Sequence, residues 1–452
     1  MKIEWREVEL PDFGVPEELT TIPTKVYEER CCKAYTNAGC DWLIIYGDRE
    51  HFANLTYLTA FDPRFEEALL LLGPDDLRIL VVGNEGMGYT SQAGLKLDTA
   101  LCQTFSLMGQ DRSIAPSLLN VLLQTGIRRG QRLGLVGWKY LEPEEWSDGR
   151  QSFFAPAMLV DLLRELTNDP EAVVDKTWVL MHPTRGLRSN NEVEQIAAFE
   201  WAAARASSAV MRIVRGTQPG MTELQAVSCM GYAGEPLSAH VMFTSGKDKI
   251  IGLHSPRSRR IERGVAASTG VGFWGGLCCR AGLVIEEHDE FLTRIAIPYF
   301  RGLASWYNTV HIGVKGHEVY ETVSEILAQG GLRSALNPGH LTSLDEWVHS
   351  PIRLFSTEQI SSGMAFQSDI IPVPMPPGFA INCEDTLVFA DSNLRVDLAR
   401  RYPETWSRIQ ARQDFMRQKL GIEVSDETLP LSTIPAYLSP LWLLPSKVLV
   451  VD

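Results

Sequence analysis

The first part of the chain alternates short apolar runs with stretches of helical spacing. Residues 41–46, 68–72, 78–82 and 132–137 are apolar and strand-like, and residues 115–124 have the spacing of a helix. The turn-forming sequence Gly73-Pro-Asp-Asp76 separates the second run from the third and predicts a hairpin. This alternation is typical of an α/β domain built on a mixed sheet.

The pattern changes near residue 185, where proline, glycine and asparagine interrupt it. Pro183, Gly186 and the pair Asn190-Asn191 are followed by a long alanine-rich segment. A chain of 452 residues is long enough for two domains with separate cores. We therefore predict one domain over residues 1–185 and a second over residues 186–452.

The second domain begins with helical patterns. Ser189 and Glu192 have the spacing of a capping box, and apolar residues then recur with helical spacing as far as Gly216. Thr222 and Gln225 predict a second helix start of the same kind. Further along, strands are predicted at 265–268, 276–285 and within 364–389, and helices near 307–311 and over 317–329. The fold class predicted for the whole chain is α+β.

Composition and charge exclude several classes of function. A net charge of −14 repels phosphate backbones, so no nucleic-acid partner is expected. We see neither an N-terminal secretory pattern nor an apolar run long enough to span a bilayer, which predicts a cytoplasmic protein with no membrane association. The eight cysteines are then expected to be reduced thiols, and their spacing is not that of a zinc site.

Several motifs resemble those of the creatinase/prolidase superfamily, in the order in which that family has them. In the first domain these are YGDREH at 46–51 and NLTYLTAFDPRFE at 54–66. In the second they are RSNNE at 188–192 and GMTE at 220–223. The resemblance implies an N-terminal creatinase-type α/β domain followed by a C-terminal pita-bread domain, in a homodimeric enzyme that acts on a small molecule.

The resemblance also indicates which residues line the catalytic pocket. His254 in HSP, His340 in GH and His349 in the same loop correspond to the histidines of the family. Asp369 stands where the family has a glutamate ligand, and Glu384 matches its last ligand. We therefore predict these five residues as the catalytic group, with His349 or His254 transferring protons and an acidic residue orienting an imidazole or binding a substrate amine.

The two metal-binding aspartates of the family are absent. Ser268 and Cys279 occupy their positions. A dinuclear site needs several carboxylates to balance four positive charges on ions about 3.5–4 Å apart. We expect no paired metal site and no cofactor; if one ion does bind, its ligands would be His340, Asp369 and Glu384.

The five remaining predicted residues concern binding of substrate. Arg280 follows Cys279, and we expect it to anchor a carboxylate or another anion. Cys279 is either a nucleophile or a small residue filling the space of a metal, and Ser268 is a pocket residue. In the first domain, Phe61 and Arg64 either close over the pocket of a neighbouring subunit, as the resemblance suggests, or form a surface loop.

Three functions are consistent with these residues. The first is a metal-independent, creatinase-like hydrolase that cleaves an amide or amidine C–N bond of a small, anionic metabolite through histidine acid–base catalysis. The second is an Xaa-Pro-type peptidase with a single metal ion. The third is a catalytically silent relative that binds a small ligand or a partner.

Overall fold

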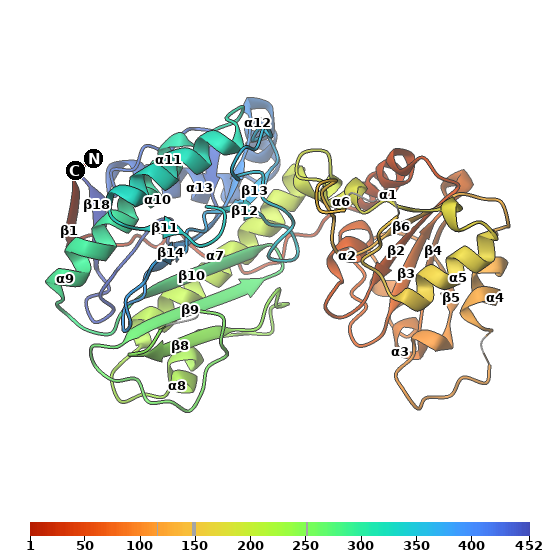
Figure 1. The fold of residues 1–452 in the computed structure, drawn as a ribbon, viewed down its shortest axis with the longest axis horizontal. Helices are drawn as coiled ribbons and strands as arrows, with labels where there is room; N and C mark the ends of the chain where they lie inside the picture. The colour runs from red at the N-terminus through yellow and green to blue at the C-terminus, as the bar shows by residue number, and fades with distance from the viewer. Residues whose placement is uncertain (115, 147–150, 250–251) are drawn as a thin grey trace. The chain divides into compact units, whose positions relative to one another are not determined.

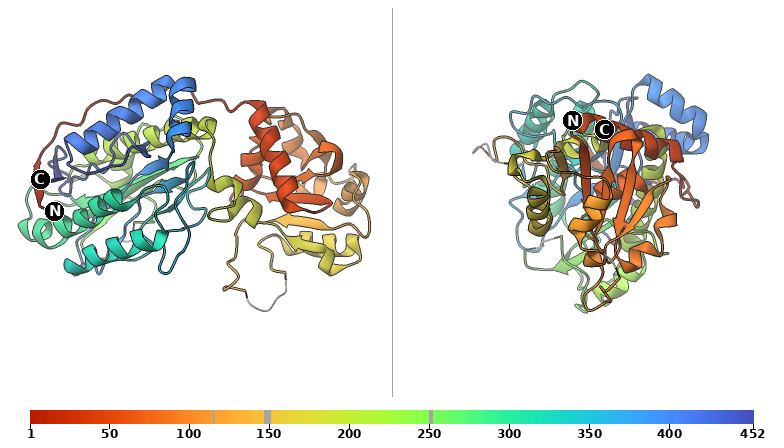
Figure 2. Two further views of the ribbon diagram at one scale, coloured as in Figure 1. Left: turned by 90° about the horizontal axis from the view of Figure 1, so that it is seen from above. Right: turned by 90° about the vertical axis from the view of Figure 1, so that its right-hand side faces the viewer.

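The computed structural model describes residues 1–114, 116–146, 151–249 and 252–452, and it divides into two compact units. The smaller unit is Ile22–Arg188, and the larger combines Met1–Thr21 with Ser189–Asp452 (Figure 1). Residues 1–21, which were predicted to belong to the first domain, are therefore part of the larger unit. The reason is that β1 (Ile3–Glu7) pairs antiparallel with β18 (Lys447–Val451). The two ends of the chain accordingly lie together in Figures 1 and 2.

A six-stranded mixed sheet forms the centre of the smaller unit, in the order β5-β4-β3-β2-β6-β7. The hairpin predicted at Gly73 is confirmed, since β3 and β4 pair antiparallel across it. Three other pairs are parallel: β4 with β5, β2 with β6, and β6 with β7. The strands are β2 (Trp42–Gly47), β3 (Ala68–Leu72), β4 (Arg78–Val82), β5 (Asp98–Leu101), β6 (Leu133–Val136) and β7 (Val173–Asp175).

Helices connect and cover these strands. They are α1 (Thr24–Ala38), α2 (Ala53–Thr59), α3 (Asn84–Met87), α4 (Leu118–Gln124), α5 (Ala157–Thr167) and α6 (Trp178–Met181). The helix predicted over residues 115–124 is observed as α4, and residue 115 lies outside the described residues. Its first turn is capped by the Ser117 side chain, which accepts a hydrogen bond from the Asn120 N–H.

Two four-stranded sheets hold the site-bearing strands of the larger unit. Their orders are β15-β10-β9-β8 and β12-β13-β16-β17. The strands of the first are β8 (Met242–Gly246), β9 (Ala266–Phe273), β10 (Gly276–Leu283) and β15 (Asn382–Glu384). Those of the second are β12 (His340–Leu341), β13 (Ala365–Gln367), β16 (Thr386–Phe389) and β17 (Thr428–Pro430), and β11 (Arg333–Ser334) pairs separately with β14 (Pro372–Val373).

Helices surround these sheets, and the longest, α7, packs against β9 and β10. Its buried alanines allow a close approach: a side chain added at Gly276 of β10 would meet the Ala203 backbone at 2.5 Å. The helices are α7 (Val193–Gly216), α8 (Glu223–Ser228), α9 (Asp289–Phe291), α10 (Ile297–Thr309), α11 (Gly316–Gln329), α12 (Ser392–Arg401) and α13 (Pro403–Gln418).

One of the two predicted capping boxes is confirmed. The Thr222 hydroxyl accepts from the Gln225 N–H, and the Gln225 side chain accepts from the Thr222 N–H. The box predicted at Ser189 is wrong, because α7 begins at Val193 and Ser189 belongs to a preceding 3₁₀ turn. Ser189 therefore lies too early in the chain to cap the first turn of α7.

Among the described residues, no helix combines the length and the hydrophobicity needed to cross a bilayer.

Candidate functional site

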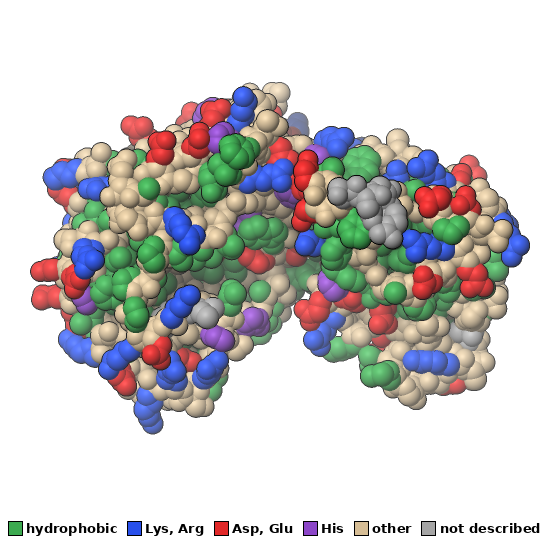
Figure 3. Space-filling model, viewed as in Figure 1, with side chains coloured by type: hydrophobic (Ala, Val, Ile, Leu, Met, Phe, Trp, Pro, Cys, Tyr) green, Lys and Arg blue, Asp and Glu red, His purple; other side chains and the backbone are tan. Residues whose placement is uncertain are grey.

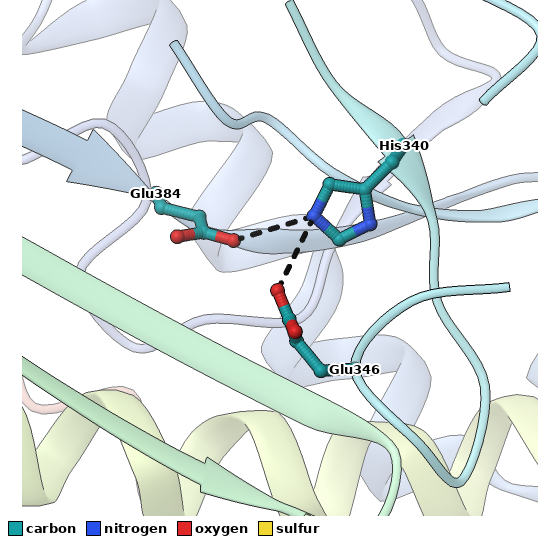
Figure 4. A group of neighbouring side chains, drawn as sticks. All are labelled: His340, Glu346 and Glu384. Atoms are coloured by element: carbon teal, nitrogen blue, oxygen red, sulfur yellow. Dashed lines mark ion pairs between the residues drawn. The ribbon is translucent and has the colours of Figure 1, made fainter. Parts of the chain in front are cut away.

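A histidine and two glutamates of the larger unit meet at one point (Figure 4). His340 Nε2 lies 3.7 Å from Glu384 Oε1 and 3.8 Å from Glu346 Oε1. The imidazole is fully buried, the Glu384 side chain is nearly so, and the Glu346 side chain is 39% exposed. Both carboxylates point at the same ring nitrogen from distances longer than a hydrogen bond. We call these three residues the His340 cluster.

Short strands and a tight hairpin bring the His340 cluster together. Glu384 ends β15, where it lies opposite Cys279 of β10. His340 begins β12, and the chain turns back after it: Leu341 N–H donates to the His349 carbonyl at 2.7 Å, and Val348 N–H donates to the Leu341 carbonyl at 3.0 Å. This hairpin folds Glu346 back toward the ring that precedes it.

The hydrogen bond on the other ring nitrogen of His340 determines the state of Nε2. Nδ1 lies 3.3 Å from the Leu341 carbonyl oxygen, which can only accept, so we place a proton on Nδ1. In the neutral ring Nε2 then carries a lone pair directed at two carboxylates. His340 Nε2, Glu384 Oε1 and Asp369 Oδ1 are buried without a hydrogen-bond partner in the described part of the chain. A positive charge at this point would satisfy all of them.

The carboxyl groups around the cluster are poorly solvated. Burial, followed by repulsion from Glu346, raises the pKa of Glu384 to about 8. Burial and the nearby Glu384 charge likewise raise the pKa of Asp369 well above its ordinary value. Asp369, two residues beyond β13, is thus electrostatically coupled to the cluster.

The raised pKa of Glu384 predicts a pH-dependent stability. A carboxyl that binds its proton more tightly when folded contributes stability below its ordinary pKa of 4.5, and this is lost as the pH rises through about 8. Between pH 5 and pH 8.5 the metal-free protein should therefore lose about 2–4 kcal/mol of unfolding free energy more than Glu384→Gln does. Urea unfolding after treatment with EDTA measures the difference. Equal losses in the two proteins would contradict this explanation.

The residues present fit one divalent cation. All three ligand atoms of His340, Glu346 and Glu384 lie within 4.8 Å of one another. Nitrogen and oxygen ligands of one tetrahedral zinc ion are separated by about 3.3–3.6 Å, given zinc–ligand lengths of about 2.0–2.2 Å, and the distances to Nε2 are close to this range. Glu346 is the third member of this group, where the sequence predicted Asp369. The side chain of Asp369 is shorter than that of a glutamate, which is consistent with its absence from the group.

A pair of ions does not fit. Antiparallel register places Cys279 of β10 opposite Gly270 and Ala281 opposite Ser268 of β9, so Ser268 and Cys279 share one face of the sheet. Glu384 lies on this face too, opposite Cys279. This wall offers a hydroxyl and a thiol where bridging carboxylates would be required.

The surroundings of Cys279 favour the space-filling alternative predicted for it over the nucleophile. Burial and the charge of Glu384 raise the pKa of the Cys279 thiol well above its ordinary value. A thiol in this state has little thiolate at neutral pH. Its predicted alternative, a nucleophile activated by Arg280, therefore has no electrostatic support.

Alkylation tests this assignment of Cys279. Brief treatment with iodoacetamide at pH 7.5 is expected to label the exposed Cys32 at least about tenfold faster than Cys279. Peptide mass spectrometry measures both rates in one sample. If Cys279 were labelled first, the thiol would be activated and the space-filling role would be wrong.

Arg280 does not face the pocket, which corrects the prediction that it anchors an anionic substrate. The residue is 3% exposed, and both Asp385 carboxylate oxygens accept from Nη2 at 2.9 Å. The guanidinium also donates to the carbonyls of Tyr437 and Glu384. Successive residues of a strand point to opposite faces, so Arg280 and Asp385 lie behind the wall that Cys279 and Glu384 present.

The other two predicted histidines differ in their surroundings. His254 is exposed, and its Nδ1 lies 3.3 Å from Arg257 Nη2. Its polypeptide segment is held by Glu223, whose carboxylate accepts from the Arg257 N–H at 2.9 Å. His349 is half-buried and lies at the end of the hairpin that carries Glu346. A role for either in proton transfer stays a prediction.

In the smaller unit, Phe61 is buried and Arg64 is exposed. Phe61 is 1% exposed and stacks on Tyr89, with ring centroids 5.1 Å apart, so it cannot reach into a neighbouring subunit as predicted. Arg64 is exposed on the following loop and has a left-handed backbone, with φ of 56°. Its role at a subunit interface stays a prediction.

Figure 3 shows hydrophobic side chains gathered along a hollow on one face of the larger unit, over the region of β9 and β10, with acidic side chains among them. The unit that contains the His340 cluster thus has a hollow lined mainly by hydrophobic side chains, as substrate pockets usually are.

Comparisons with known proteins show the fold. No model of a known protein family matches the sequence, and no curated protein does. Among solved structures, the X-Pro aminopeptidase of Thermotoga maritima matches with a TM-score of 0.64 at 14% identity, over 91% of this chain and 98% of that one. The prolidase of Pyrococcus horikoshii OT3 matches with a TM-score of 0.61 at 16% identity, over 80% and 95% of the two chains.

The Xaa-Pro dipeptidase of Bacillus anthracis is similar in the same way, with a TM-score of 0.60 at 15% identity over 82% of this chain and 96% of that one. The creatinase/prolidase fold that the sequence motifs predicted is therefore confirmed: an α+β protein with a pita-bread unit. At these identities the likeness extends to the fold, and function depends on the site itself.

Proposed function

We propose that this protein is a hydrolase that cleaves a C–N bond of a small molecule with the help of one divalent cation held by His340, Glu346 and Glu384. The observation that carries the proposal is the buried, unpartnered Nε2 of His340 between two carboxylate oxygens. The solved structures that share the fold are named as prolidases, dipeptidases and aminopeptidases, which supports the choice of a C–N bond.

The residues would divide the chemistry as follows. A divalent cation bound at the cluster would supply Lewis acidity toward a carbonyl oxygen or water. Asp369 interacts electrostatically with the cluster without belonging to its three ligands, and burial raises its pKa, which makes its carboxylate a stronger base. Asp369 would accept a proton from the attacking water as the C–O bond forms and deliver it to the nitrogen as the C–N bond breaks.

A metal-independent hydrolase is the second candidate, and one observation favours it. With its pKa raised to about 8, Glu384 is a protonated acid at neutral pH when no cation is bound. It could then donate to the leaving nitrogen while His340 Nε2 accepts a proton from water. The missing carboxylates at Ser268 and Cys279 are consistent with both candidates.

A substrate screen with chelation tests the proposal. Small amides, ureas and dipeptides would be incubated with zinc-loaded protein, and release of the amine or ammonia would be measured. We expect turnover that EDTA removes and zinc restores. Turnover that persists after removal of all metal would favour the metal-independent candidate, and the absence of turnover on every compound would favour a silent binding protein.

A further inference from the structure

An aromatic side chain lies directly on the catalytic histidine. The Trp347 indole stacks on the His340 imidazole with ring centroids 4.0 Å apart and an interplanar angle of 19°. His340 is fully buried, whereas Trp347 keeps 38% of its surface exposed. Trp347 follows Glu346 in the hairpin that begins at His340. The indole is therefore accessible to solvent within a few ångströms of the ring that carries Nε2.

Carboxylates lie close to the imidazole on which this indole stacks, with Glu346 Oε1 3.8 Å and Glu384 Oε1 3.7 Å from His340 Nε2. Glu346, Asp369 and Glu384 interact electrostatically with one another, and only His340 among the cluster residues can carry a positive charge. The guanidinium of Arg280 is paired with Asp385 on the opposite face of the sheet.

From this combination we infer that the substrate carries a cationic nitrogen, such as an alkylammonium group, which packs against the exposed part of the Trp347 indole. An indole face attracts cations through its quadrupole, more strongly than other aromatic side chains do. The neighbouring carboxylates, when ionised, also attract cations. This inference rests on the proposed function for the position of the reacting bond, and it reverses the expectation of an anionic substrate.

Trp347 then has two tasks. Against His340 it holds the plane of the imidazole, so that Nε2 faces Glu346 and Glu384. Toward solvent it selects molecules by charge. The first task is structural and the second determines substrate specificity. Two substitutions distinguish them. Leucine removes the aromatic face, whereas phenylalanine keeps an aromatic face that attracts cations more weakly.

Binding of two matched probes tests the inference without any need for turnover. n-Butylammonium chloride and 1-butanol have similar shapes, differ in charge, and contain no bond that the proposed hydrolase would cleave. Calorimetric titration of zinc-loaded protein at pH 7 measures both dissociation constants. We expect n-butylammonium to bind at least about tenfold more tightly than 1-butanol. Trp347→Leu should weaken n-butylammonium about tenfold and 1-butanol less than about twofold.

Trp347→Phe is the matched control, and it should bind n-butylammonium within about threefold of the unmodified protein. Equal binding of the two probes, or an equal weakening of both by Trp347→Leu, would overturn the inference. Should Trp347→Leu fail to fold by circular dichroism, Trp347→Phe and the two probes on the unmodified protein still decide the matter. A charge preference without any amide turnover would support this inference while contradicting the hydrolase proposal.

Discussion

Replacing His340 with alanine is expected to lower the affinity of the protein for zinc at least about a hundredfold. The substitution removes the one nitrogen ligand of the His340 cluster and leaves Glu346 and Glu384 to repel each other around the cation site. Loss of residues that merely support a metal ligand costs about 10–100-fold in affinity, so loss of the ligand itself should cost more. Competition with a fluorescent zinc chelator measures the affinity.

His254→Ala is the matched control for this prediction. Both residues are histidines of the predicted catalytic group, but His254 is exposed and its ring contacts Arg257. Its replacement should leave zinc affinity within about twofold, because an exposed single imidazole binds zinc weakly. If the two variants lost affinity equally, the cation would be bound elsewhere and the cluster would lose its assigned role.

Replacing Asp385 with asparagine should destabilise the larger unit by about 3–5 kcal/mol, because it leaves the buried guanidinium of Arg280 without its counter-charge. Asp385 is 1% exposed and accepts from Arg280 and from the Ala436 N–H at 2.8 Å. The pair joins β10 to the segment after β15, directly behind Glu384. The midpoint and slope of urea unfolding give the change in free energy.

Two comparisons test the origin of that loss. Arg294→Ala breaks an exposed ion pair with Glu290 and should change stability by less than about 1 kcal/mol. The double replacement Arg280→Met with Asp385→Leu removes both buried charges, and we expect it to lose less than the sum of the single replacements. Simple additivity of the single losses would contradict a direct interaction between the two side chains.

The fold was predictable from sequence because its signals are local and occur in order. The hairpin at Gly73, the strand at β6 and the cap at Thr222 each depend on a few neighbouring residues. The position of residues 1–21 depends instead on the pairing of β1 with β18, across more than four hundred residues. Nothing in the first segment of the chain indicates that partner.

The site was predictable in part. His340, Asp369 and Glu384 were predicted from motifs and lie together around one point. Glu346 was missed because its approach to His340 depends on a hairpin that no motif marks. Arg280 was misplaced although a signal was available: it follows Cys279 on a strand, and two adjacent strand residues cannot both face the same pocket.

His340 and Glu384 thus lie together in the larger unit, and the sheet face that carries Glu384 presents a hydroxyl and a thiol, from Ser268 and Cys279. Under the proposed function, Glu346 supplies a second carboxylate at His340, which is enough negative charge for one cation but not for two.

The stoichiometry of bound metal tests this most directly. Protein loaded with zinc, freed of excess by gel filtration and analysed for metal is predicted to hold one equivalent per chain, and His340→Ala close to none. Two equivalents in the unmodified protein, or none, would contradict the single-cation site.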